Sequence, residues 1–227
     1  MKKRCLHKKI VLGVTGSLSS GKTTVAGMLR ALGAEVIDAD RIAHELILPG
    51  KPAHKEIVRL FGKDILKKNE VPRTGGSRRN TRAAAAHYRP RKYKVVDRKA
   101  LGRLVFCDKR LLKKLDQCLH PRVIALIKKS IRCARAKVVV LDAPLLLEAG
   151  LGQVVDKLIV VTASRAKQMR RARIKMGLEE KEITSRITAQ IPLEEKAAMA
   201  DFIIDNNGSL QKTRRQVTQI WRLLWKN

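Results

Sequence analysis

The chain has 227 residues, 44% of them hydrophobic, which is enough to bury a full core in one domain with insertions. No apolar run approaches the ~18 residues of a membrane span, and the basic N-terminus lacks the apolar segment of a secretory signal. The net charge of +30 indicates an anionic partner, such as nucleic acid, acidic lipid or an anionic small ligand, unless the whole proteome is basic. The four cysteines form no C-x-x-C pair and no zinc spacing, so we expect reduced thiols in a cytoplasmic protein.

A glycine-containing loop follows the first expected strand, 9–14. Residues 16–23, Gly-Ser-Leu-Ser-Ser-Gly-Lys-Thr, fit the phosphate-binding pattern G-x-x-x-x-G-K-[ST], and residues 24–32 have the apolar spacing of a helix. In this context the loop N–H groups and the helix N-terminus point at a polyphosphate. Lys22 would reach the β- and γ-phosphates and the Thr23 hydroxyl would bind Mg²⁺, so we expect a nucleotide-binding protein.

Two aspartates end the second expected strand, 35–38. Ligands of open α/β sheets bind outside the carboxyl ends of the strands, where a carboxylate could accept a proton from a substrate hydroxyl or position Mg²⁺. The alternative is that an aspartate caps the helix expected over 41–62. We expect one of Asp38 and Asp40 to cap that helix and the other to act in the site, and we favour Asp40 as the functional residue.

A long insertion, residues 41–136, separates the second strand from the third and predicts a helical subdomain, with a second helical stretch over 98–135. His120-Pro121 is expected to end or kink a helix there. Within the insertion, the polar, turn-rich and basic segment 67–95 predicts a loop or disorder. Tyr88 and Tyr93 among its cations would allow weak RNA contact by stacking, although a solvated surface insertion is the favoured interpretation.

Three more buried strands are expected at 137–142, 157–162 and 201–205, which makes five. Asp142 ends the first of these three, in the arrangement that supports Mg²⁺ directly or through water. Helices are expected at 164–176, 179–190 and 209–225. The segment 164–199 is basic and then acidic, as in a mobile lid over phosphates, and one or two of its cations are expected to enter the site. The predicted fold is α/β, a parallel five-stranded sheet flanked by helices.

Five motifs in chain order together resemble the dephospho-CoA kinase family: 13–23, 36–40, 119–121, 142–148 and 205–209. The resemblance implies a phosphate-loop NTPase core (9–40, 137–163 and 200–227), a helical CoA-binding subdomain (41–136) and a lid (164–199) in a single kinase domain, 9–227. It also implies ATP-dependent phosphorylation of the ribose 3′-hydroxyl of dephospho-CoA, the final step of coenzyme A synthesis, with ATP and Mg²⁺ bound.

The resemblance also assigns roles to residues. It makes Asp40 the general base, beside Lys22 and Arg171 as catalytic residues, and it makes Thr23 and Asp142 the metal-binding pair. Its ATP-binding residues are Leu18, Ser19, Ser20, Gly21, Lys22, Thr23 and Thr24, with Asn206, Asn207 and Gly208 bordering the adenine. Its residues for the acceptor substrate are Asp40, Arg98, His120, Pro144 and Leu145.

The sequence departs from the family pattern in three places. The phosphate loop has serines at 17 and 19 where the family more often has further glycine. The lid lacks the second arginine followed by aspartate after Arg171, and the family gives no role for residues 69–94.

Two other functions compete with this one. Another small nucleoside or nucleotide kinase would need different acceptor residues, and a nucleic-acid-binding NTPase would show salt-sensitive RNA binding. We expect a monomer or a small homo-oligomer.

Overall fold

The computed structural model of the chain describes residues 9–69 and 93–225. Contacts divide it into two compact units, one formed by the residues up to Ile42 together with those from Ile124 onward, the other by Ala43–Val123. No helix within the described ranges is long and apolar enough to cross a membrane. The two units are described separately.

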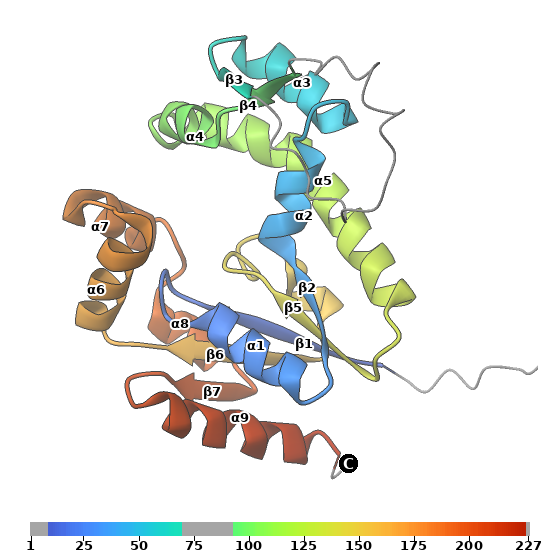
Figure 1. Ribbon diagram of the computed structural model, residues 1–227, viewed down its shortest axis with the longest axis vertical. Coiled ribbons are helices and arrows are strands. Elements are labelled where there is room, and N and C mark those ends of the chain that lie inside the picture. The colour runs from blue at the N-terminus through green and yellow to red at the C-terminus, as the bar shows by residue number, and fades with distance from the viewer. Residues whose placement is uncertain (1–8, 70–92, 226–227) are drawn as a thin grey trace, which may run out of the picture. The chain divides into compact units, whose positions relative to one another are not determined.

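The first unit is built on a parallel sheet (Figure 1). Its five strands have the order β2-β5-β1-β6-β7, and every ladder between neighbours is parallel. This confirms the predicted sheet, because each strand lies where a continuous apolar run predicts it. The strands are β1 (Ile10–Gly16), β2 (Glu35–Asp38), β5 (Val138–Asp142), β6 (Lys157–Thr162) and β7 (Phe202–Asp205).

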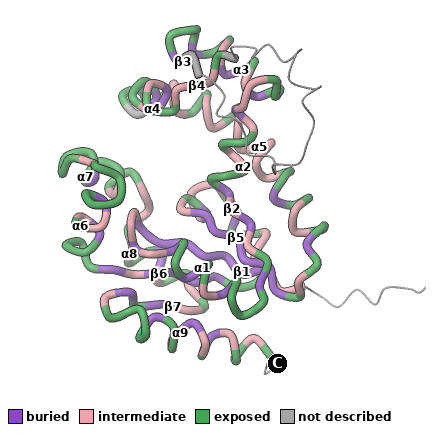
Figure 2. Tube along the Cα trace, viewed as in Figure 1, coloured by how far each residue is buried: buried purple, intermediate pink, exposed green. Residues whose placement is uncertain are grey.

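One face of this sheet forms a core with two helices, α1 (Lys22–Ala31) and α9 (Leu210–Leu223). Alternate strand residues such as Leu12 and Val14 pack there with Leu29 of α1 and Ile220 of α9, and the strands appear as the main buried band in Figure 2. Because the strands are parallel, their carboxyl ends share one edge of the sheet. The phosphate loop follows β1 at that edge, and Asp38 of β2 lies opposite Asp142 of β5.

Three helices connect β6 to β7: α6 (Arg165–Met176), α7 (Glu180–Thr188) and the short α8 (Leu193–Ala198), while a 3₁₀ turn, η2 (Leu151–Val154), precedes β6. The first two helices confirm the predictions for 164–176 and 179–190. The α6 helix ends at Gly177, whose φ of 62° is left-handed. The α8 helix was not predicted, because six residues are too few to show a helical period.

The second unit contains the second half of α2 (Ala39–Leu46), all of α3 (Pro52–Phe61) and α4 (Arg98–Phe106), and the first part of α5 (Lys109–Cys133). Its core joins Ile57 and Phe61 of α3 to Val105 of α4 and Cys118 of α5.

The predicted helix over 41–62 is wrong in one respect, since it is two helices. The chain turns at 47–51, before Pro52 starts α3. The stretch 98–135 is likewise two helices, because Asp108 accepts hydrogen bonds from the backbone N–H groups of Arg110 and Leu111 and so caps α5.

The ends of the segment 67–95 are not a loop. Strands β3 (Leu66–Asn69) and β4 (Tyr93–Val96) form an antiparallel pair in which Asn69 lies opposite Tyr93. Sequence patterning missed them because β3 is mostly polar and its partner lies more than twenty residues away along the chain. Residues 70–92, with Tyr88, lie outside the described residues, so the prediction of RNA contact there stays a prediction.

Of the two expected effects of Pro121, ending a helix is wrong, because α5 continues through it. Proline removes the hydrogen bond that the carbonyl of Gln117 would accept. Pro121 and Gln117 are both exposed, so water can bind that carbonyl. One turn away, the guanidinium of Arg122 donates to the Cys118 carbonyl oxygen and pairs with Glu56 at 2.6 Å, which ties this part of α5 to α3.

Candidate active site

The phosphate loop connects β1 to α1 and is tightly enclosed. A Cβ on Gly16 would lie 2.3 Å from the Val161 carbonyl oxygen, and one on Gly21 would lie 2.0 Å from Nδ2 of Asn206. Both glycines also have positive φ angles, 148° and 105°. Ser19 has a φ of 55° and is the one non-glycine residue with positive φ in the described part of the chain. Ser19 therefore adopts the left-handed backbone conformation at a position where the family more often has glycine.

Lys22 is buried at the start of α1, where its Nζ donates to the carbonyl oxygens of Gly16 and Ser17 at 3.1 and 2.8 Å. Burial lowers the pKa of this ammonium to about 8, while the nearby carboxylates of Asp142 and Asp40 oppose the shift. Polyphosphate oxygens at this position would stabilise the charged form further, so the ammonium is placed to bind anions.

Asp142 is buried at the carboxyl end of β5. Burial raises its pKa to about 6, against the stabilising charge of Lys22 and a hydrogen bond with the Thr23 hydroxyl. The predicted metal-binding pair, Thr23 and Asp142, is thus in direct contact. Both residues offer oxygen atoms, the ligand type that Mg²⁺ prefers. The described ranges contain no group of three His, Cys, Asp or Glu side chains arranged to hold a metal ion.

The alternatives for Asp38 and Asp40 are separated by the first turn of α2. The Asp38 carboxylate accepts a hydrogen bond from the Arg41 backbone N–H at 2.9 Å, which is the contact of a helix cap. Asp40 is exposed in the first turn of α2. Its carboxylate is close enough to raise the pKa of both Lys22 and Asp142. Asp38 is therefore the capping residue, and Asp40 remains the functional candidate.

Several polar groups around the loop fit a phosphate ligand. The hydroxyls of Ser17 and Ser20 are buried and have no hydrogen-bond partner among the described residues. The first turn of α1 begins at Gly21 without a side-chain cap, so its N–H groups face the loop. These donors suit oxyanions of the kind that a nucleotide carries.

Asn206, directly after β7, holds the other side of the loop. Its Nδ2 donates to the Ser20 carbonyl oxygen at 2.7 Å, and its Oδ1 accepts from the Thr213 hydroxyl at 2.9 Å. Arg171 of α6 joins the same cluster, since its guanidinium donates to the carbonyl oxygens of Ser20 at 3.3 Å and Asn206 at 3.0 Å. The structure thus brings two predicted site residues to the phosphate loop.

Beside Arg171 lies a basic pocket of about 290 Å³, lined by Lys167, Arg170, Arg171 and Gly208. The Lys167 ammonium donates to the carbonyl oxygen of Asn207. Two cations of the segment 164–199, Lys167 and Arg171, therefore contact the loops that form the site. Arg173 instead pairs with Glu180, as expected for a cation on a solvated helix face.

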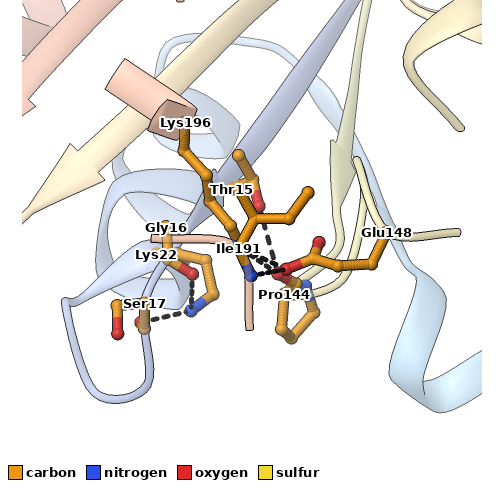
Figure 3. A network of polar contacts seen from close by, with 8 residues as sticks. All are labelled: Thr15, Gly16, Ser17, Lys22, Pro144, Glu148, Ile191 and Lys196. Carbon is orange, nitrogen blue, oxygen red and sulfur yellow. Dashed lines mark hydrogen bonds and ion pairs between the residues drawn. The ribbon is translucent and has the colours of Figure 1, made fainter. Parts of the chain in front are cut away.

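The loop after Asp142 contains Pro144 and the 48% exposed Leu145, both predicted to bind substrate. Polar contacts that sequence reasoning missed hold this loop (Figure 3). The Pro144 carbonyl oxygen accepts from the Thr15 hydroxyl at 3.2 Å and from the Lys196 ammonium at 3.3 Å. Lys196 lies in α8 after two glutamates, a charged stretch that is typical of an exposed surface, and no local pattern marks it as buried.

Two predicted substrate residues belong to the second unit. Arg98 is exposed as the first residue of α4. His120 is half-buried in α5, with Nε2 3.6 Å from Oδ1 of Asp116, one turn earlier.

The fold and the loop define a phosphate-loop nucleotide-binding protein of the α/β class. The family model described as dephospho-CoA kinase matches residues 10–74 and 85–212. The dephospho-CoA kinase of Symbiobacterium thermophilum is 42% identical over 93% of this chain and 80% of its own length, and that of Geobacter metallireducens is 38% identical over 94% and 96%. The chain belongs to the dephospho-CoA kinase family, which phosphorylates dephospho-CoA in the last step of coenzyme A synthesis.

Two solved structures are similar to the chain over most of its length. The crystal structure of TT1252 from Thermus thermophilus is 30% identical, with a TM-score of 0.76 over 97% of this chain and all of that one. Dephospho-CoA kinase from Campylobacter jejuni is 26% identical, with a TM-score of 0.62 over 95% of this chain and 97% of that one. The predicted family and fold are therefore confirmed.

Proposed function

We propose that this chain transfers the γ-phosphoryl group of ATP to the ribose 3′-hydroxyl of dephospho-CoA, giving coenzyme A and ADP. One observation carries the proposal: in a chain of this family, the closed phosphate loop brings Lys22 and Thr23 against Asp142, with the Asp40 carboxylate close by. A phosphate cradle, an oxygen pair for a cation and a carboxylate are the parts that phosphoryl transfer needs.

The chain's own residues divide the work between binding and charge neutralisation. The loop residues 18–24 hold the phosphates by N–H groups and hydroxyls, and Lys22 neutralises charge that develops on the transferred group. Thr23 and Asp142 would hold Mg²⁺, which supplies further neutralisation of the phosphate oxygens when bound. Arg171 and the loop at 206–208 bind the nucleotide from the other side.

Asp40 is proposed as the base that accepts the proton of the attacking ribose hydroxyl. Arg98, His120, Pro144 and Leu145 are proposed to bind dephospho-CoA. The segment 164–199 is proposed as a lid that closes over the nucleotide, and residues 41–136 as the substrate-binding subdomain. We further propose a cytoplasmic enzyme that works as a monomer or small homo-oligomer, with nucleic acid playing no part in its main activity.

The test is ADP formation with ATP, Mg²⁺ and dephospho-CoA, measured for the wild type and for Asp40→Asn. We expect substrate-dependent turnover in the wild type and a kcat about 10²- to 10⁴-fold lower in Asp40→Asn. Asp38→Asn is the matched control, because asparagine also caps helices and should keep kcat within about threefold. A wild type that binds ATP but forms no ADP with dephospho-CoA would overturn the proposal, and ADP formation stimulated by RNA would then favour the nucleic-acid-binding NTPase.

A further inference from the structure

Lys196 is the largest fully buried side chain in the described ranges, at 0% exposure, and it carries a charge. Its Nζ lies 2.7 Å from Oε1 of Glu148 and 3.3 Å from the Pro144 carbonyl oxygen (Figure 3). Removing an ammonium from water costs several kcal/mol, which its ion pair repays only when the geometry is good. A lysine on the surface of a short helix would need no explanation, but a fully buried one does.

The contacts of this pair connect three segments of the site. The Pro144 carbonyl oxygen also accepts from the hydroxyl of Thr15, which directly precedes the phosphate loop. Oε1 of Glu148 also accepts from the backbone N–H of Ile191 at 3.1 Å, where the segment 164–199 returns to the sheet. Three segments therefore meet at one ion pair, whose ammonium is fully buried and whose carboxylate is 20% exposed. They are the end of the segment 164–199, the loop after Asp142 and the last residue before the phosphate loop.

Stability alone accounts poorly for this arrangement. Buried ion pairs are often no more stabilising than apolar pairs of the same volume. The second oxygen of Glu148, Oε2, is buried and has no hydrogen-bond partner among the described residues, which adds a further cost. The pair does, however, orient two backbone groups from different segments, the Pro144 carbonyl and the Ile191 N–H.

We propose that Lys196 and Glu148 are positioning residues for phosphoryl transfer. Together they fix the Pro144 carbonyl and the end of the segment 164–199, and so hold the loop after Asp142 in a fixed position relative to the phosphate loop. This inference rests on the proposed function, because the reaction must be assayed to test it. It adds two residues that act through the Pro144 carbonyl and the Ile191 N–H that they hold.

The first test compares Lys196→Met, Glu148→Gln and the double variant with the wild type. Each single variant leaves one buried partner uncompensated, so both urea stability and kcat should fall, kcat by about 10- to 100-fold, since small misplacements of reacting groups cost rates of that order. The double variant removes both charges at nearly constant volume, and the side-chain amide oxygen introduced by Glu148→Gln would still accept from the Ile191 N–H. Its urea midpoint should return toward that of the wild type, while its kcat stays at least about tenfold low.

A second pair of variants leaves the ion pair intact. Thr15→Val removes the other donor to the Pro144 carbonyl without changing volume, whereas Thr15→Ser keeps the hydroxyl. We expect Thr15→Val to lower kcat about tenfold with the KM for ATP within about threefold, and Thr15→Ser to restore kcat to within about threefold of the wild type. If a Lys196 variant fails to fold, the two Thr15 variants still test the positioning role.

The outcomes separate the two levels of inference. A wild type inactive on dephospho-CoA refutes the proposed function itself. An active wild type whose double variant regains kcat together with stability, or whose Thr15→Val variant equals Thr15→Ser, shows that the ion pair is only structural and overturns the positioning role.

Discussion

Asn206→Ala is the most informative change to the side of the site that is proposed to bind the nucleotide. Asn206 is 4% exposed and makes two side-chain hydrogen bonds, to Ser20 at 2.7 Å and Thr213 at 2.9 Å. Both partners keep a longer contact, from Arg171 to Ser20 at 3.3 Å and from Thr213 to Ser209 at 3.3 Å, so neither is left fully unpaired. Two lost bonds at about 1 kcal/mol each, with a small cavity, give about 2–3 kcal/mol of lost stability.

The assay is urea unfolding together with ADP binding by calorimetry. At about 2–3 kcal/mol per molar urea, the unfolding midpoint should fall by about 1 M. ADP should bind at least about tenfold more weakly, because the Ser20 end of the phosphate loop loses its support.

Gln216→Ala is the matched control for that variant. Gln216 also makes two hydrogen bonds beside β7, with the backbone N–H and carbonyl of Asp205 at 2.9 and 2.8 Å, but none with the loop. It should lose stability and keep ADP affinity within about twofold. If Asn206→Ala bound ADP as tightly as this control does, the contact with Ser20 would not shape the loop.

Three further predictions concern the loop, the sheet and the insertion. Ser19→Gly removes the strain of a left-handed serine but increases the entropy of the unfolded chain. The free energy of unfolding, measured from the urea midpoint, should therefore stay the same or rise by up to about 1 kcal/mol. A lower free energy of unfolding would show that the Ser19 side chain stabilises the loop. A hydrogen bond from Lys157 lowers the pKa of Asp201, so the carboxylate's contribution is complete above the ordinary pKa of about 4 and is lost as the pH falls through the lowered value. Asp201→Asn should therefore unfold at lower urea than the wild type at pH 7, and the difference should vanish at low pH; a gap that persists there would refute the assignment. Replacing residues 70–92 by an Asn-Gly turn should keep kcat within about threefold, since the strands around them already pair; a larger loss would give the insertion a role in catalysis.

The sheet was predictable because its signal is local. Buried parallel strands are continuous apolar runs, and Val138–Asp142 with Lys157–Thr162 have no other plausible structure. The phosphate loop was equally visible, since its glycines and Lys22 occupy fixed positions in a short motif. Site residues that lie together in one continuous segment can therefore be predicted from the sequence.

The remaining contacts depend on segments that meet only in the fold. Lys196 lies in Leu193–Ala198, whose charges suggest a solvated helix, and only packing beside Glu148 shows that it is buried. The choice between Asp38 and Asp40 likewise needed the position of one backbone N–H. The β3–β4 pair joins strands that are distant in sequence, which local periodicity cannot show.

The most direct test of the central claim is the identity of the product. The wild-type protein would be incubated with ATP, Mg²⁺ and dephospho-CoA, and the products analysed by mass spectrometry and phosphorus NMR. We predict one ADP for each molecule of coenzyme A, with the new phosphate on the ribose 3′-oxygen. ADP formed without phosphorylated acceptor, or a phosphate at another position, would contradict the account.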